Sequence, residues 1–242
     1  DNPVLRIENQ MLLTGDTVIC AARDVRDVTV PEGITTIGRG AFYSAQVERV
    51  TLPEGLMEIQ QEAFYDCFAL RSISLPESLQ SIGASAFSSC RALAEITLPE
   101  GLRTIGKRAF DWTGLTSLHL PENLEEIGHS AFSSNAELQE VTFPKNLRVI
   151  PMDMFYGCSA LGKVVLPEKL EWLEASAFAF CEALTEIDLP EGVRFLGRNA
   201  FERCGFASIC IPDSVTEIEG NPFKNCKALR TVELSPNHPL LT

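Results

Sequence analysis

The sequence predicts a β-solenoid, a chain wound into stacked turns of nearly equal length, and three observations predict it. Proline and phenylalanine each recur at intervals of 22 or 23 residues through nine successive units. Each unit also contains a stretch of strand length in which apolar and polar residues alternate. No unit is long enough to bury its own apolar side chains. Stacking neighbouring units buries them in a shared core, with parallel strands about 4.8 Å apart.

Two columns of residues define the repeat. Nine of the 14 prolines form one column: Pro31, Pro53, Pro76, Pro99, Pro121, Pro144, Pro167, Pro190 and Pro212. Nine of the 14 phenylalanines form the other: Phe42, Phe64, Phe87, Phe110, Phe132, Phe155, Phe178, Phe201 and Phe223. The short units lose a residue at one place, just before the next strand, at 45–47, 113–115 and 204–206. A loss confined to one loop is typical of a fixed turn with a tolerant corner.

The unit at residues 70–92 shows the elements in order. Residues 70–75 alternate Leu, Ile and Leu with polar positions, which predicts a short strand with one buried face. Pro76 ends this strand because proline has no N–H to donate to a ladder, and Pro-Glu suits a type I turn. Residues 79–83 return to an extended apolar segment, and residues 85–90 have room for about one helical turn.

We expect one domain over residues 1–242. Residues 1–24 contain Thr-Gly-Asp between apolar runs, and we interpret them as a hairpin-like cap on the first turn. Residues 25–234 hold about nine to ten repeats. Residues 235–242 are a C-terminal tail, with the start of a following segment as the alternative interpretation.

The repeat L-x-x-I-x-L-P-x-x-L-x-x-I-G-x-x-A-F-x-x-C-x-x resembles the BspA-type leucine-rich repeat family of bacterial and protist surface proteins. The resemblance runs from about Val25 to Leu234. Met154 and Pro222 depart from its Ala, and Pro151, Glu174 and Glu219 from its Gly. It implies a right-handed leucine-rich repeat solenoid with a parallel β-sheet on one face and short strand or helical-turn segments on the others. It also implies a secreted or cell-surface location, adhesion or host-protein binding in some members, and no catalytic residues.

Composition excludes several classes of function. The chain carries 20 Lys and Arg against 33 Asp and Glu, a formal net charge of −13, and has no basic cluster. Binding to nucleic acid or to an anionic membrane is therefore disfavoured. No apolar run approaches the roughly 18 residues of a membrane helix, so we expect no membrane insertion.

The cysteines suggest a structural role. Six of the eight occupy one repeat column: Cys67, Cys90, Cys158, Cys181, Cys204 and Cys226. Neighbouring turns hold such residues about a strand spacing apart, farther than the roughly 3.8 Å between disulfide-bonded Cβ atoms. There is no C-x-x-C pair for zinc. We expect buried free thiols in the column, and an exposed thiol at Cys210, which falls at a polar strand position.

The sequence gives little support for a metal site or a catalytic site. Acidic residues follow eight of the nine column prolines, but on solvated turns that lack the mixed oxygen ligands of a calcium loop. Sequence motifs for a nucleophile elbow, a phosphate loop or a zinc protease are absent. We therefore expect no cofactor, no metal and no enzymatic activity.

Two outward-facing positions are candidates for binding a partner. The position before the last apolar residue of the second segment is polar in six units, but is Val149, Trp172 and Phe195 in three consecutive ones. Stacked, these residues form an apolar strip of the kind that marks interfaces, unless a loop around Phe180 covers it. The first strand presents a second stripe, whose composition changes after six turns and which includes His119, Val165 and Asp188.

The main hypothesis is therefore a non-enzymatic extracellular recognition or adhesion module that binds a protein or a glycan. The alternative is a structural spacer within a larger surface protein. An enzyme is the third class, and its activity would have to depend on residues such as His119 or Asp188.

Overall fold

The structure is a computed structural model that describes residues 5–234, 236 and 238–239. These residues form short β-strands joined by turns, with no α-helix among them. The chain divides into two compact units, one of residues 1–115 and 123–132 and the other of residues 116–122 and 133–242. Each unit is a stack of solenoid turns whose strands pair in parallel from one turn to the next, as the sequence predicted. The expectation of a single domain over the whole chain stays a prediction.

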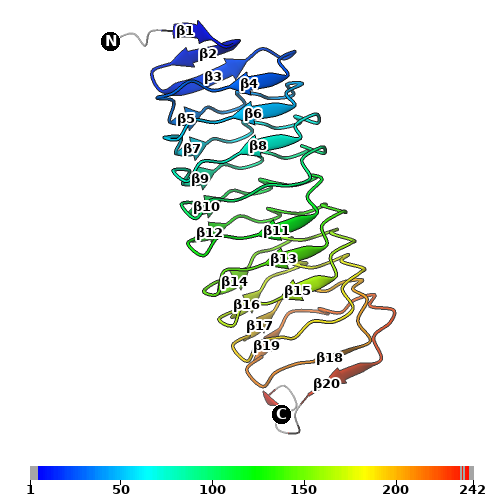
Figure 1. Cartoon of the computed structure of the whole chain (residues 1–242). Helices are drawn as coiled ribbons and strands as arrows, with labels where there is room; N and C mark the ends of the chain where they lie inside the picture. Colours follow the sequence, from blue (N-terminus) through cyan, green and yellow to red (C-terminus); the bar gives the residue numbers. More distant parts are fainter. Residues whose placement is uncertain (1–4, 235, 237, 240–242) are drawn as a thin grey trace. The chain divides into compact units, whose positions relative to one another are not determined.

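The first unit contains two sheets (Figure 1). One has the strand order β1-β2-β3-β5-β7-β9-β10-β12 and the other has the order β4-β6-β8. The strands are β1 (Leu5–Glu8), β2 (Met11–Thr14), β3 (Thr17–Ala21), β4 (Asp27–Thr29), β5 (Thr36–Ile37), β6 (Arg49–Thr51), β7 (Glu58–Ile59), β8 (Ser72–Ser74), β9 (Ser81–Ile82), β10 (Thr104–Ile105) and β12 (Glu126–Ile127). β1, β2 and β3 form an antiparallel meander, and β3 then pairs in parallel with β5.

The second unit contains three parallel sheets. Their orders are β11-β13-β15, β14-β16-β17-β19 and β18-β20. The strands are β11 (Ser117–His119), β13 (Glu140–Thr142), β14 (Val149–Ile150), β15 (Lys163–Val165), β16 (Trp172–Leu173), β17 (Phe195–Leu196), β18 (Ser208–Cys210), β19 (Glu217–Ile218) and β20 (Thr231–Glu233).

Strand register places equivalent residues of successive turns side by side. In the first unit Ile82 pairs with Ile59 on one side and Ile105 on the other. Each of these two-residue strands buries its second residue and directs its first outward, except that Ile127 of β12 is half-buried. Zero register shift therefore turns every repeat position into a continuous row, either inside the core or on the surface.

The phenylalanine column is the core of each unit. Phe42, Phe64, Phe87, Phe110 and Phe132 stack in the first unit, with neighbouring ring centroids 4.8 to 5.4 Å apart. Phe155, Phe178, Phe201 and Phe223 stack in the second, at 5.4 to 5.9 Å. These separations lie close to the strand spacing of about 4.8 Å, so the rings stay in contact at the repeat distance set by the backbone.

The segment around each phenylalanine is a turn and not the helical turn that the sequence predicted. Ser85 and Ser89, on either side of Phe87, have φ of 53° and 65°. The N–H groups of Ser85, Phe87 and Ser89 donate to carbonyls of the next turn, for example Phe87 N to Ala109 O at 2.7 Å. A helix needs negative φ and uses its N–H groups internally. Here only the alternate N–H groups, such as that of Ser88 to Ser85 O, bond within the segment, and the others bond to the next turn.

The cysteine column forms a second internal row. All eight cysteines are free thiols; five of the six in the column are buried and Cys210 is exposed, as predicted, whereas Cys226 is half-buried. Cys67 Sγ lies 2.9 Å from Phe42 O and Cys90 Sγ 3.1 Å from Phe64 O, so each thiol donates to the phenylalanine carbonyl of the preceding turn. Cys181, Cys204 and Cys226 repeat this contact. Each of these carbonyls also accepts a backbone N–H, as Phe42 O does from Ala45 N at 2.9 Å, so the thiol is a second donor that ties the carbonyl to the next turn.

Replacement of Phe110 tests the aromatic core. Because Phe110 is fully buried between two stacked rings, we expect Phe110→Ala to lower the free energy of unfolding by about 3–5 kcal/mol in denaturant titrations. Phe68 is 55% exposed, and Phe68→Ala should change it by no more than about 0.5 kcal/mol. Equal effects of the two changes would contradict an internal column.

Thiol labelling tests the cysteine row. Burial raises the pKa of Cys67 to about 12 and raises the pKa of Cys90 and Cys181 well above the usual value. Because the thiolate is the reactive form, these thiols should stay unlabelled by a disulfide reagent at pH 8 until the protein unfolds. Exposed Cys20 and Cys210 should react at once. Rapid labelling of the column in the native protein would show that the row is open to solvent.

Candidate functional site

The outward residues of the two-residue strands form different surfaces in the two units. In the first unit they are all polar: Thr36, Glu58, Ser81, Thr104 and Glu126. In the second unit they are Val149, Trp172, Phe195 and Glu217. The backbone is the same at both sets of positions, so only the side chains distinguish the surfaces.

The apolar strip, defined as Val149, Trp172 and Phe195, is assembled by strand register. Val149 pairs with Trp172, and Trp172 pairs with Phe195. Val149 is 36% exposed, Trp172 is 40% exposed and Phe195 is half-buried. With strands about 4.8 Å apart, the three side chains form one continuous surface about 10 Å along the stack.

Phe180 does not cover the apolar strip. Its ring lies 5.0 Å from the ring of Tyr156, centroid to centroid, and the guanidinium carbon of Arg203 lies 5.2 Å from its centroid. These contacts hold Phe180 at the turn corner beside the phenylalanine column, away from β16. Trp172 remains exposed as a consequence, so the covering loop that the sequence left open is not formed by Phe180.

The edge of the apolar strip is neutralised. Arg148, next to Val149, forms an ion pair with Glu171, next to Trp172. Beyond the strip, the carboxylate of Glu174 accepts a hydrogen bond from Met152 N at 2.9 Å. Glu174 occupies the glycine position of the repeat, and this bond to the preceding turn gives its side chain a structural role. The charges of Arg148 and Glu171 thus offset each other beside the apolar side chains.

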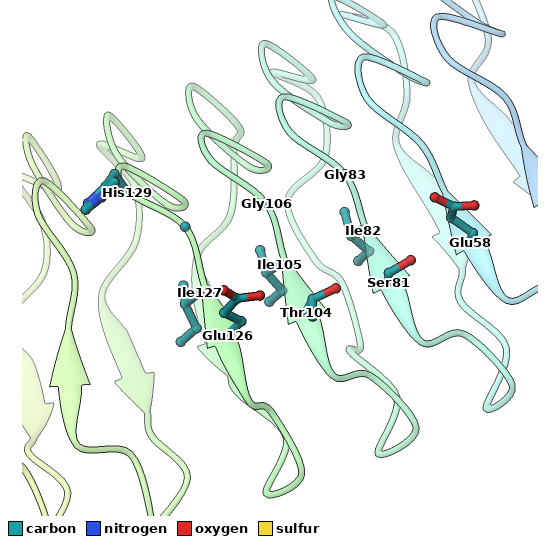
Figure 2. A pocket seen from close by; sticks show the side chains of 11 residues that line it. Glu58, Ser81, Ile82, Gly83, Thr104, Ile105, Gly106, Glu126, Ile127 and His129 are labelled. Carbon is teal, nitrogen blue, oxygen red and sulfur yellow. The ribbon is translucent and has the colours of Figure 1, made fainter.

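The equivalent polar surface of the first unit is a groove of about 560 Å³ (Figure 2). Glu58, Ser81, Thr104 and Glu126 line it with their side chains, and His129 lies at one end. Gly83, Gly106 and Gly128 form part of its wall. The described residues contain no group of three or more His, Cys, Asp or Glu side chains arranged to hold a metal ion. The sequence identified the polar column but not the groove, because its width depends on how the glycines pack.

The glycines are required by the approach of neighbouring turns. A Cβ built on Gly106 would lie 2.5 Å from Ala84 N, and one on Gly128 would lie 2.3 Å from Lys107 N. Both distances are shorter than real Cβ contacts, so any side chain there forces the turns apart.

The second set of predicted residues does not form one cluster, and only His119 and Val165 lie on three-residue strands. His119 pairs with Thr142, and Thr142 pairs with Val165, so His119 and Val165 share a face two strands apart. Val165 is strongly exposed, beside the hydrogen bond from Lys163 to Glu140 that raises the pKa of Lys163. Asp188 is exposed on an extended segment outside the sheets. His119 and Asp188 thus show no catalytic pairing.

The sequence did not predict the aromatic side chains, some exposed and some half-buried, that occupy the turn corners. Tyr43 and Tyr65 stack at 5.0 Å, and Trp112 lies at the corner of a later turn of the same unit. Tyr156 and Phe180 occupy corresponding corners of the second unit. The repeat itself contains a signal for these aromatic residues. They occupy the first or second position after the column phenylalanine, where most turns have a small or polar residue.

Comparison with known proteins identifies the repeat. Residues 17–133 and 103–230 match the BspA type Leucine rich repeat region, in six copies. A leucine-rich repeat protein from Bacteroides ovatus ATCC 8483 is 27% identical over 97% of this chain and 70% of its own, with a TM-score of 0.83. The T. pallidum Leucine Rich Repeat protein (TpLRR) is 29% identical over 76% of this chain and 88% of its own, with a TM-score of 0.67.

A third structure shares the fold alone. It is a leucine-rich repeat protein from Eubacterium ventriosum ATCC 27560, 23% identical over 84% of this chain and 65% of its own, with a TM-score of 0.61. A search of the curated proteins gave no match. The part of the chain that the structure describes contains no long apolar helix able to cross a membrane. These likenesses confirm the predicted leucine-rich repeat solenoid.

Replacement of Gly106 tests the close packing behind the polar groove. We expect Gly106→Ala to lower the free energy of unfolding by about 1–3 kcal/mol, because its Cβ collides with the backbone of the preceding turn. Gly55 has no atom within 4 Å of a built Cβ, so Gly55→Ala is the matched control and should be nearly neutral. Thermal and denaturant melts of both variants make the measurement. A neutral Gly106→Ala would mean that the turns can separate without loss.

Proposed function

Since the chain belongs to the BspA-type leucine-rich repeat family, we propose that it is a non-enzymatic recognition module, secreted or at the cell surface, that binds a protein partner through the apolar strip. The stack supplies a rigid scaffold, and the outward columns supply the binding chemistry. The single observation that carries the proposal is the in-register exposure of Val149, Trp172 and Phe195 on β14, β16 and β17.

The composition of the strip favours a protein over a glycan. Trp is enriched among residues that dominate protein interfaces, and apolar groups at the centre of an interface are surrounded by polar groups that exclude water. The strip has this arrangement, since the Arg148–Glu171 pair and Glu217 lie around it. Its area is small beside the roughly 800 Å² per partner of a standard interface, so it acts as an anchor within a larger contact.

The spacer alternative makes no use of this surface. A spacer needs the stack and polar outward columns, as in β5, β7, β9, β10 and β12, whose outward residues are all polar. Three consecutive apolar exceptions add nothing to stacking, because their inward neighbours Ile150, Leu173 and Leu196 already fill the core. Solubility alone would favour polar residues at all three positions.

Binding to a panel of purified extracellular-matrix proteins tests this function. We expect one or more to bind, and Trp172→Ala with Phe195→Ala to weaken that binding at least tenfold, as expected on loss of a central apolar anchor. The melting temperature should change little, because Trp172 is exposed and Phe195 only half-buried.

The control variant is Ser81→Ala with Thr104→Ala, at the same column of the first unit. It should leave binding unchanged. Protein binding that survives the strip variant would rule out the strip as the site. Absence of any protein ligand, in assays of the folded chain, would favour the spacer.

A further inference from the structure

Trp112 has a backbone conformation that its own side chain disfavours. The position two residues after the column phenylalanine is left-handed in all nine turns, with φ between 53° and 76°. Six turns have Ser, Asp, Asn or Gly there, residue types that are small or tolerate this region. Trp112 occupies it at φ 57°. A bulky residue in this conformation is strained, so folding alone gives no reason for a tryptophan here.

Packing does not require Trp112 either. Its side chain is 51% exposed and lies outside the phenylalanine column. Strained residues that contribute nothing to the core are characteristic of binding and catalytic sites. The strained and exposed Trp112 is therefore a candidate binding residue.

Arg91 holds the Trp112 ring from the preceding turn. Its guanidinium carbon lies 5.2 Å from the ring centroid, within the range of a cation–π interaction. The corner after Trp112 is one of the three short corners, and Gly114 there lets the chain approach closely: a Cβ on Gly114 would lie 2.5 Å from Arg91 O. The short corner thus brings the turns of Arg91 and Trp112 together and fixes the ring before any ligand arrives.

A surface pocket of about 280 Å³ lies beside this ring. Tyr65 and Trp112 line it, together with Arg91, Arg108, Asp111 and three serines. Tyr65 is itself held by stacking on Tyr43, with centroids 5.0 Å apart. The volume is just below the roughly 300–1,000 Å³ of ligand sites, which suits one small ring and not an extended chain.

The polar groups of this pocket match hydroxyl groups. Arginine only donates hydrogen bonds, an ionised carboxylate only accepts them, and serine does both. A ligand hydroxyl can donate to Asp111 and accept from Arg108 or Arg91 at once. Asp111 offsets one of the two arginines, the Trp112 ring engages Arg91, and the chain has a formal net charge of −13, so the pocket does not select an anionic ligand. A ring with a C–H face and hydroxyl edges can stack on an aromatic side chain and use these groups together.

We propose that the Trp112 pocket binds one neutral pyranose residue of a glycan, stacked on the Trp112 ring with its hydroxyls on Asp111, Arg108 and the serines. This site lies wholly in the first unit and is separate from the apolar strip. By contrast, the pocket at the other charged corner, next to Arg203, is lined by Glu182, Asn225 and Lys227 without an aromatic ring.

Tryptophan fluorescence provides a direct assay. The chain has two tryptophans, so in Trp172→Phe the emission reports Trp112 alone. Titrating this variant with chitotetraose, cellotetraose and mannotetraose, up to about 10 mM, should change the emission with at least one of them. A hyaluronan tetrasaccharide, which carries carboxylates, is the acidic probe and should bind at least tenfold more weakly.

Calorimetry on protein that keeps Trp172 distinguishes an effect of Trp112 on sugar binding from an effect on folding. Trp112→Asn should weaken binding of the same neutral sugar more than tenfold while the melting temperature stays equal or rises, because Asn tolerates the left-handed conformation. Phe180→Asn is the matched control, since Phe180 is also aromatic at φ 64° under an arginine but is not part of the lining of the pocket next to Arg203. It should leave sugar binding unchanged.

Several outcomes would overturn the proposal. They are no response to any neutral sugar, equal binding by Trp112→Asn, tighter binding of the acidic probe, or loss of a protein ligand instead of a sugar when Trp112 is replaced. Trp172→Ala with Phe195→Ala should keep the sugar affinity. If that variant loses a protein partner but keeps the sugar affinity, the result supports the apolar strip as a protein site and does not contradict the sugar site.

Discussion

The structure depends on the hydrogen-bonded contact between one turn and the next. In the first unit, Gly83 N donates to Ile59 O at 2.7 Å toward the preceding turn, and Phe87 N donates to Ala109 O at 2.7 Å toward the following one. These bonds fix the separation of turns near the strand spacing. The stacked phenylalanines, the thiol-to-carbonyl row and the glycine contacts all require that separation, so no turn has a stable structure alone.

The same constraint determines what the surface can do. Because register is fixed, a change of residue type at one outward position in consecutive turns creates a continuous surface and not scattered side chains. Ser81, Thr104 and Glu126 thereby line a groove, while Val149, Trp172 and Phe195 make the apolar strip. Evolution of binding in such a scaffold needs only outward substitutions, since the inward residues that hold the stack are untouched.

The turn corners offer a different kind of surface. Their backbone is left-handed at two positions in nearly every turn, which projects short segments away from the core. Side chains there are free of the packing demands on the strands, and aromatic rings gather at the corners of each unit. A recognition module of this design can therefore present flat apolar surface on its strands and ringed pockets at its corners, each with its own class of partner.

The sequence by itself determined the repeat, the buried columns and the family, because the period of proline and phenylalanine follows directly from a backbone that returns to the same position every turn. It also determined that Val149, Trp172 and Phe195 are neighbours, since strand register follows from that period. It could not give the conformation of the corner, where the local length suited a helical turn but alternate N–H groups, such as that of Phe87, donate to the next turn.

Only the tertiary structure decided which aromatic side chains are exposed and what lies beside them. Phe180 was a reasonable cover for Trp172 in sequence, yet its ring packs on Tyr156 because the left-handed corner directs it there. Trp112, Arg91 and Tyr65 come from three successive turns, and their meeting depends on the sign of φ at Trp112 and the close approach at Gly114. The repeat period does not predict the φ of Trp112 or the close approach at Gly114, because both depend on contacts between turns.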